Sequence, residues 1–290
     1  MPKHAPSTSA VTGTTWQNVP TRTVDVAGTS FAYRQLGPKT GVPLVFLHHF
    51  TAVLDDWDPR VIDGLAATRP VITFDNRGIG ATGGSVPHTV EEMARDAVAF
   101  IRALGLEQVD LLGFSLGGGV AQVIALTEPA LVRRMILAGT GPAGGGSITQ
   151  VGKVAFGAYV RGALTWKDPK HYLFFPRTPA GKQAGRDYMA RLKERTQDRD
   201  KRISPLAMRA QLKAILAFGR SKPHDLGAIS QPVLVANGDY DVMVSSNRSA
   251  DMARRLPNAK LVIYPDSGHG GVFQYHEQFV PEVQTFLDAS

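Results

Sequence analysis

Short runs of apolar, often β-branched residues recur along the chain and alternate with longer stretches of mixed polarity. Such runs predict β-strands, and eight of them occur, at Thr23–Val26, Phe31–Gln35, Leu44–His48, Val71–Asp75, Val109–Phe114, Met135–Ala138, Val233–Ala236 and Leu261–Tyr264. The inner runs, such as LVFLHH, VITFD and VDLLGF, are almost continuously hydrophobic. Parallel strands that helices cover on both faces have this character.

The stretches between these runs carry helical signals. The clearest follows Thr89, whose hydroxyl can cap a helix while Glu92 reaches back to the cap. Behind it, apolar residues recur at helical spacing from Met93 to Leu104. Alternation of this kind predicts an α/β fold, with a twisted, mostly parallel, eight-stranded sheet and helices on both of its faces.

The alternation is interrupted once, between Gly141 and about Asp225. This stretch opens with the glycine-rich turn GPAGGGS, contains several aromatic residues and has no inner strand pattern. An excursion of this length predicts an inserted helical lobe rather than a loop. Because ligands bind at the carboxyl ends of parallel strands, such a lobe would cover the site. We expect a core at residues 21–140 and 226–290 and a helical cap at residues 141–225.

Composition narrows the class of protein. Of the 290 residues, 43% are hydrophobic and 20% are charged, which is enough apolar material for a sizeable core. The absence of cysteine excludes a disulfide scaffold, a thiolate metal site and a cysteine nucleophile. No run approaches the ~18 apolar residues that a membrane span requires. Residues 1–20 lack the apolar stretch of a secretory signal, so we expect a mobile N-terminal leader on a cytoplasmic protein.

The positive charge belongs to one segment of the chain. The net charge is +7, whereas residues 150–227 hold 17 bases and 6 acids, a surplus of 11. A patch of this kind can attract nucleic acid or an anionic membrane, or steer an anionic substrate. Because no nucleic-acid motif accompanies the charge, we interpret it as a solvated helical face. We expect neither a nucleic-acid nor a membrane partner.

The strongest local motif is GFSLGG at residues 113–118, between the predicted strand VDLLGF and a helical pattern. A G-x-S-x-G sequence in this position is the signature of a nucleophile elbow. The backbone turns so sharply at Ser115 that side chains two positions before and after it would collide, which accounts for Gly113 and Gly117. The turn would hold the hydroxyl clear of the sheet at the positive end of a helix. We therefore predict that Ser115 is a nucleophile.

A serine hydroxyl needs a base to become an effective nucleophile. Of the eight histidines, His269 stands in a flexible turn just past the last predicted strand and is the predicted general base. The imidazole needs an acceptor that fixes its tautomer. Asp239 and Asp241 both follow the predicted strand VLVAN, and the residue pattern alone does not choose between them. The order Ser, Asp, His is the one expected for an elbow of this type.

With these residues the chain resembles an α/β-hydrolase fold protein with a helical cap, over residues 21–287. The segments that carry the resemblance are GFSLGG, DNRGIG at Asp75–Gly80, GDYD at Gly238–Asp241 and SGHGG at Ser267–Gly271. The family usually places its acid three residues after the glycine, which implies Asp241. The resemblance also implies that the backbone amides of Phe50 and Leu116 bind the oxyanion. Where the family usually has glycine, this chain has His49, whose side chain we expect in the pocket.

Two weaker motifs do not predict cofactor or metal sites. GIGATG at residues 78–83 fits the glycine pattern of a dinucleotide loop, but the next helix begins only near Thr89. The adjacent His48 and His49 would point to opposite faces of a strand, and no carboxylate accompanies them in a metal-binding motif. We expect neither a cofactor nor a metal ion.

The motifs and the resemblance together predict a serine hydrolase of the esterase or lactonase kind. Ser115 would form an acyl-enzyme with a small or medium carboxylic ester or lactone, which is the expected partner molecule. A serine counts against the dehalogenase and epoxide hydrolase branches of the family, which use aspartate. The alternatives are a cofactor-free haloperoxidase or perhydrolase, a C–C hydrolase or an amidase on the same triad, a slow-turnover ligand receptor, and a basic binding module.

Overall fold

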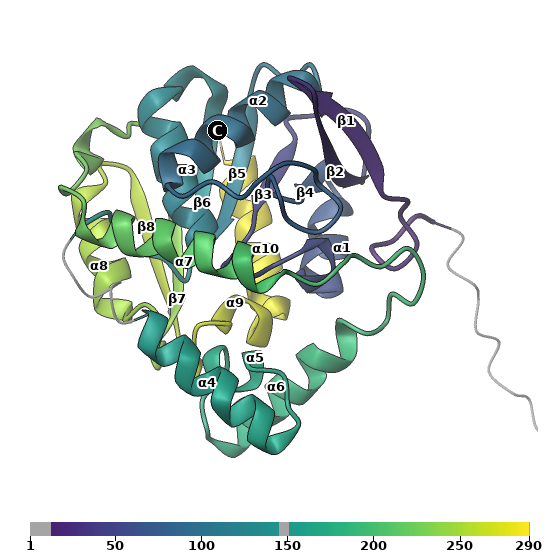
Figure 1. The fold of residues 1–290 in the computed structure, drawn as a ribbon. Helices are drawn as coiled ribbons and strands as arrows, with labels where there is room; N and C mark the ends of the chain where they lie inside the picture. Colours follow the sequence, from purple (N-terminus) through teal and green to yellow (C-terminus); the bar gives the residue numbers. More distant parts are fainter. Residues whose placement is uncertain (1–12, 145–150, 290) are drawn as a thin grey trace, which may run out of the picture.

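The computed structural model describes residues 13–144 and 151–289. Its centre is an eight-stranded sheet with the strand order β1-β2-β4-β3-β5-β6-β7-β8 (Figure 1). The strands are β1 (Arg22–Val26), β2 (Thr29–Leu36), β3 (Leu44–Leu47), β4 (Val71–Phe74), β5 (Val109–Phe114), β6 (Val132–Ala138), β7 (Val233–Gly238) and β8 (Ala259–Tyr264). Strand β2 is antiparallel to β1 and β4, and every pairing from β4 to β8 is parallel. The predicted α/β fold with a mostly parallel sheet is confirmed.

The strands coincide with the predictions at their apolar centres and differ at their ends. Strand β6 begins at Val132 rather than at Met135, and Arg133 in its first half finds a partner inside the sheet. The Arg133 guanidinium donates to both carboxylate oxygens of Asp110 on β5, at 3.0 and 2.6 Å. A search for apolar runs misses a strand that starts with paired charges.

Helices cover both faces of the sheet. Helices α1 (Pro59–Ala66) and α10 (His276–Asp288) pack together on one face, and α2 (Val90–Ala103) and α3 (Leu116–Thr127) on the other (Figure 1). Helices α8 (Ser246–Arg255) and α9 (Gly271–Gln274) follow β7 and β8. As predicted, the Thr89 hydroxyl caps α2 by accepting from the amide of Glu92 at 3.2 Å. Within the described ranges, no helix has the length and apolar character needed to cross a bilayer.

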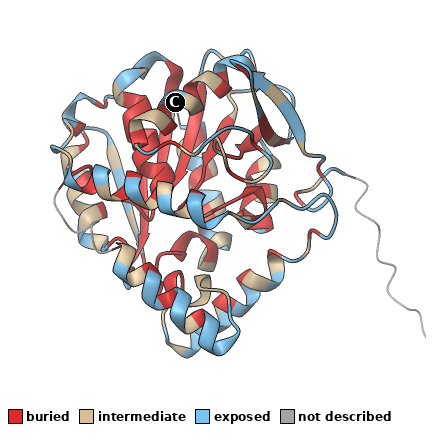
Figure 2. Ribbon diagram, in the orientation of Figure 1, coloured by how far each residue is buried: buried red, intermediate tan, exposed pale blue. Residues whose placement is uncertain are grey.

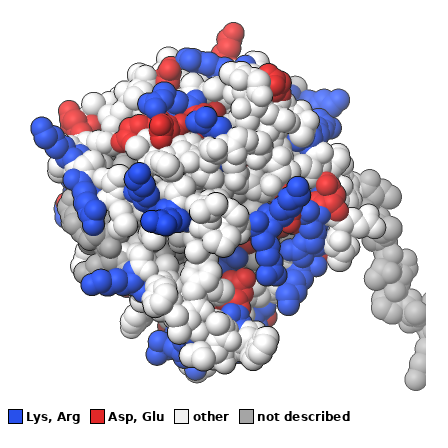
Figure 3. Space-filling view, in the orientation of Figure 1, with Lys and Arg blue, Asp and Glu red and all other residues white. Residues whose placement is uncertain are grey.

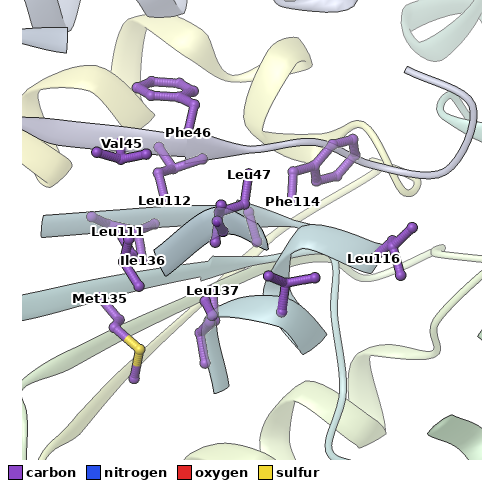
Figure 4. Packing of buried hydrophobic residues seen from close by; sticks show 14 of the residues in the cluster. Val45, Phe46, Leu47, Leu111, Leu112, Phe114, Leu116, Met135, Ile136 and Leu137 are labelled. Atoms are coloured by element: carbon purple, nitrogen blue, oxygen red, sulfur yellow. The ribbon is translucent and has the colours of Figure 1, made fainter. Parts of the chain in front are cut away.

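The hydrophobic core lies between the sheet and these helices. Figure 2 shows the central strands buried along their whole length, and β3, β5 and β7 have no exposed residue. Figure 4 shows the packing around β5, where Leu112 and Phe114 approach Phe46 and Leu47 of β3 while Ile136 and Leu137 follow on β6. This rigid layer supports the loops at the carboxyl ends of the strands.

Among the described residues, four α-helices lie between β6 and β7 along the chain. They are α4 (Val151–Thr165), α5 (Lys170–Leu173), α6 (Pro179–Arg191) and α7 (Pro205–Arg220). We call this segment, residues 151–220, the lobe; α4, α5 and α6 gather beyond one end of the sheet (Figure 1). The division of the chain into a core and a cap at residues 141 and 225 stays a prediction.

Ion pairs fasten the lobe to the core. Three acids in the short segment before α1 each pair with a cation of the lobe. Asp55 lies 3.3 Å from Arg199, Asp56 lies 2.9 Å from Lys170, and Asp58 lies 2.7 Å from Arg191. Lys and Arg side chains predominate on the face that Figure 3 shows. Part of the basic surplus of residues 150–227 therefore neutralises acids of the core, and the interpretation as a solvated face holds only for the remainder.

Residues 13–20 differ from the expected mobile leader. The side chain of Trp16 is 2% exposed and packs into the core together with Val19. The Trp16 amide donates to Asp63 on α1 at 2.7 Å, and the Arg34 guanidinium lies 5.0 Å from the indole ring. The prediction of a mobile leader does not hold at Trp16 and Val19, whose buried side chains anchor a stretch that is otherwise mostly exposed. Residues 1–12 of the expected leader lie outside the described residues.

Candidate active site

Ser115 occupies the turn between β5 and α3. Its φ of 55° and ψ of −113° lie in a region of backbone conformation that residues other than glycine rarely adopt. This conformation costs about 1–3 kcal/mol of conformational energy. A Cβ atom on Gly113 would lie 2.4 Å from the carbonyl oxygen of Gly117, and one on Gly117 would lie 2.0 Å from the carbonyl oxygen of Leu47. Both glycines are therefore required, as the motif predicts. The surrounding core holds Ser115 in its strained conformation at the carboxyl end of β5.

His269 lies in the loop between β8 and α9 and contacts Asp241. The two side chains are buried, and the Nδ1 atom of His269 lies 2.7 Å from Oδ2 of Asp241. The other carboxylate oxygen, Oδ1, accepts from the amides of Met243 at 2.7 Å and Val244 at 2.9 Å. Because a carboxylate only accepts hydrogen bonds, the Nδ1 atom carries the proton and Nε2 keeps a lone pair in the neutral imidazole.

Asp239, the other aspartate of the GDYD segment, has a different role. Its side chain is exposed, and Oδ1 accepts from the amide of Ser267 at 3.1 Å. It therefore connects the loop after β7 with the loop after β8 instead of contacting the imidazole. The geometry selects Asp241 as the partner of His269, a choice that the residue pattern alone left open.

The imidazole of His269 lies against the end of the strand that carries Ser115. Its ring centroid is 5.0 Å from that of Phe114, and a Cβ on Gly139 would lie 3.2 Å from its Cε1 and Nδ1 atoms. Gly139, at the end of β6, thus leaves the space that the ring occupies. Among the described residues, no hydrogen bond joins the Ser115 hydroxyl to His269, and in ligand-free enzymes such bonds often tighten only with substrate.

A small pocket of about 40 Å³ opens beside Ser115. We call it the Ser115 pocket; its lining is mostly apolar and consists of Phe50, Val90, Ser115, Leu116, Gly119, Thr140, Gly141, Val151, Ile215, Phe218, Met243 and Val244. In the described structure, the backbone amides of Phe50 and Leu116 donate to no other protein atom. The Leu116 amide belongs to the first turn of α3, where amides have no partner inside the helix and favour negative charge.

His49 does not line this pocket, so the expectation for its side chain is wrong. Its Nδ1 atom bonds the carbonyl oxygen of Phe50 at 2.8 Å, which turns the ring inward. There it packs edge-on against Phe114 and Phe174, with ring centroids 5.2 Å away in both cases. Burial lowers the pKa of His49 to about 3, and burial lowers that of its neighbour His48 to about 4. Both rings are therefore neutral structural elements at neutral pH.

Two residues of the lobe contribute to the site and were not identified from the sequence. The amide of Thr51, a residue with a φ of 66°, donates to Oε1 of Gln211 on α7 at 2.8 Å. The carbonyl oxygen of Phe174 accepts from the amide of Gly270 at 2.9 Å, next to His269. A glutamine at a buried position of an otherwise apolar helix face is the one signal that would have indicated Gln211.

Comparisons with known proteins identify the family. The family model for the alpha/beta hydrolase fold matches residues 42–274. The chain belongs to the alpha/beta hydrolase family. This hydrolase is 29% identical over 269 residues to a non-heme chloroperoxidase of Streptomyces lividans, an alignment that covers 90% of this chain and 96% of the relative. The relatives indicate an enzyme.

Solved structures show the same fold. An alpha/beta hydrolase fold protein from Chitinophaga pinensis is 37% identical, with a TM-score of 0.91 over 96% of this hydrolase and 100% of that chain. The enol-lactonase from Burkholderia xenovorans LB400 has a TM-score of 0.75 at 20% identity, over 92% of this hydrolase and 100% of its own chain. At that identity the likeness concerns the fold alone.

Proposed function

We propose that this alpha/beta hydrolase is a serine hydrolase that cleaves a small carboxylic ester or lactone through an acyl-enzyme. The observation that carries the proposal is the strained Ser115 at the end of β5, next to Phe114, whose ring contacts a buried imidazole with its Nδ1 atom 2.7 Å from the Asp241 carboxylate. A nucleophile, an orienting acid and a base in this order along the chain fit acyl transfer.

In the proposed mechanism, the Ser115 hydroxyl oxygen attacks the carbonyl carbon while Nε2 of His269 takes the proton. Asp241 stabilises the imidazolium, and the amides of Phe50 and Leu116 donate to the oxyanion. When the tetrahedral intermediate collapses, His269 returns the proton to the departing alcohol oxygen. Water, deprotonated by His269, then attacks the acyl-enzyme and releases the carboxylic acid and the free Ser115 hydroxyl.

The Ser115 pocket supports a small acyl group. Its volume of about 40 Å³ and its lining of aliphatic and aromatic side chains suit a short, uncharged acyl chain. The lobe contributes three residues to the wall, Val151 of α4 and Ile215 and Phe218 of α7. We infer that the lobe limits the length of the acyl group.

Labelling with a fluorophosphonate tests the nucleophile without knowledge of the natural substrate. We expect one modification, located at Ser115 by mass spectrometry of the digested protein. The His269→Gln variant should label at least 100-fold more slowly, because the base is missing, and heat-unfolded protein should not label. Labelling at another serine, or undiminished labelling of Ser115→Ala, would contradict the proposal.

A perhydrolase or haloperoxidase activity is the second candidate, and the chloroperoxidase relative favours it. The same acyl-enzyme would be attacked by hydrogen peroxide instead of water, giving a peroxy acid and free Ser115. Monochlorodimedone halogenation in acetate with hydrogen peroxide and bromide measures this reaction. We would assign this activity if its turnover exceeded that of 4-nitrophenyl acetate hydrolysis and disappeared in Ser115→Ala.

A further inference from the structure

A groove lies on the other side of the loop that carries Asp241. We call it the α4–α5 groove; its volume is about 550 Å³, and it is lined by Lys153, Val154, Gly157, Ala158, Arg161, Tyr172, Leu173, Phe175, Pro176, Arg177, Tyr240, Val242 and Gly268. This volume is within the range of small-molecule sites. The groove shares no lining residue with the Ser115 pocket.

Three cations surround the groove, and no acid lines it. Among the described residues, Lys153, Arg161 and Arg177 form no ion pair with a carboxylate. The positions outside the described ranges contain no Asp or Glu that could supply one. Two other cations of the lobe, Lys170 and Arg191, are instead paired with acids of the core. Three cations that form no ion pair among the described residues therefore meet at one concave site.

The remaining lining is apolar and aromatic. The buried side chains of Leu173 and Phe175 form part of the lining, while Tyr240 and Val242 are 61% and 59% exposed. The guanidinium of Arg161 lies 4.5 Å from the centroid of the Tyr172 ring, a contact that holds a planar cation at the surface of the groove. In an amphipathic ligand, the apolar part could contact the exposed apolar side chains and the charged part could contact the cations next to them.

We propose that the α4–α5 groove is a second binding site, which takes a small molecule with an aromatic or alkyl body and a carboxylate group. The apolar part contacts Tyr240, Val242 and Phe175, and the carboxylate pairs with the three cations, with Arg161 or Arg177 able to bind both oxygens. The site also borders the catalytic segments. Tyr240 and Val242 flank Asp241, and Gly268 precedes His269.

Calorimetric titration of the full-length Ser115→Ala protein tests the site independently of any esterase activity. The probes are 4-biphenylcarboxylate and 4-biphenylcarboxamide, which share the apolar body and differ in charge. We expect the carboxylate to bind at least tenfold more tightly, and its affinity to fall as salt concentration rises. Equal affinity of the two probes, or no binding of either, would overturn the proposal.

Charge-removing variants locate the site. The triple variant Lys153→Gln, Arg161→Gln, Arg177→Gln should weaken carboxylate binding at least tenfold and leave the carboxamide unaffected. Arg209→Gln, which removes an exposed cation on α7 outside the groove, is the matched control and should change the affinity less than twofold. If loss of the Arg161–Tyr172 contact lowers the Tm, the double variant Lys153→Gln, Arg177→Gln repeats the test. Unchanged affinity in the folded variants would place the binding elsewhere and overturn the proposal.

The carboxylate in the groove could be the far end of a substrate or a separate ligand, and competition distinguishes the two sources. If the carboxylate is the far end of a substrate, the triple variant should raise KM for the charged ester acetoxybenzoate and leave KM for nitrophenyl acetate unchanged. In that case 4-biphenylcarboxylate should also compete with the charged ester. If the carboxylate belongs to a separate ligand, protein that carries a fluorophosphonate on Ser115 should bind 4-biphenylcarboxylate with unchanged affinity. The triple variant should then alter neither KM. Both results support a carboxylate site in the groove.

Discussion

Two loops at the carboxyl edge of the sheet each present a buried histidine to the same pair of aromatic rings. In the β3 loop (residues 48–52), the His49 ring centroid is 5.2 Å from those of Phe114 and Phe174. In the β8 loop (residues 265–270), the His269 centroid is 5.0 and 5.6 Å from the same two rings. The surroundings differ mainly in the acceptor of Nδ1, which is a peptide carbonyl for His49 and a carboxylate for His269.

This difference in the acceptor of Nδ1 bears on which of the two imidazoles could serve as the proposed base. A carbonyl dipole does not compensate a buried positive charge, so burial lowers the pKa of His49 to about 3. A carboxylate stabilises the imidazolium that general base catalysis requires. Aromatic packing therefore orients either ring, and in the proposed mechanism the charge of the neighbour would decide which ring acts as the base. Substitutions can alter the two loops one at a time.

The largest effect should come from neutralising the acceptor in the β8 loop. Asp241→Asn keeps the acceptor for the amides of Met243 and Val244 but removes the charge next to His269. We expect kcat for a 4-nitrophenyl ester to fall about 10³- to 10⁴-fold, as expected when the base loses its tautomer and its counter-charge. Stopped-flow or steady-state absorbance of the released nitrophenolate measures this loss.

Asp239→Asn is the matched control, because it makes the same change two residues away. Its Oδ1 atom can still accept from the Ser267 amide, so kcat should change less than about threefold. The reverse ranking of the two variants would show that Asp239 is the acid and that the contact seen at His269 does not act in catalysis.

The next largest effect concerns the two neutral histidines of the β3 loop. The folded protein holds His48 and His49 with pKa values of about 4 and about 3, whereas the unfolded chain protonates both near pH 6.5. The unfolded state therefore binds more protons below pH 6.5, and stability falls as the pH drops through this range. At pH 5 we expect each histidine to lower the free energy of unfolding by about 2 kcal/mol relative to pH 7.

His49→Asn isolates one of these contributions. An asparagine amide can donate to the Phe50 carbonyl as Nδ1 does, but it does not titrate. Between pH 7 and pH 5, urea unfolding of the variant should show a loss about 2 kcal/mol smaller than that of the wild type, whatever its stability at pH 7. Parallel pH profiles for the two proteins would mean that the His49 imidazole is not held neutral by the fold.

The sequence predicts the regular parts of this molecule well because they rest on local patterns. Continuous apolar runs mark β3 and β5, and steric crowding explains Gly113 and Gly117 beside Ser115. The features that it does not predict depend on contacts between distant segments. Trp16 is buried by residues of α1 and β2, and the direction of the His49 ring depends on Phe174 of the lobe.

A further expected effect concerns the anchor of the β3 loop, which comes from the lobe. Gln211→Leu removes the acceptor for the Thr51 amide next to Phe50, while the side chain stays similar in size. Loosening the loop should misplace the Phe50 amide and lower kcat about 10- to 100-fold, with little change in KM. Gln211→Glu keeps an acceptor oxygen and should restore most of kcat. If both variants are equally impaired, Gln211 supports the fold rather than the loop.

The smallest expected effect concerns the Ser115 pocket. The β3 loop contributes Phe50 to its lining, and the β8 loop contributes no residue. A Cβ on Gly119 of α3 would lie 3.3 Å from two atoms of the Phe218 ring, so Gly119→Ala narrows the pocket by a methyl group. We expect the ratio of kcat/KM for 4-nitrophenyl butanoate to that for the acetate to fall about tenfold. Gly157→Ala on α4, where a Cβ meets nothing within 4 Å, controls for the gain in helix propensity. An unchanged ratio in Gly119→Ala would show that the acyl group does not enter this pocket and that the lobe does not set its length.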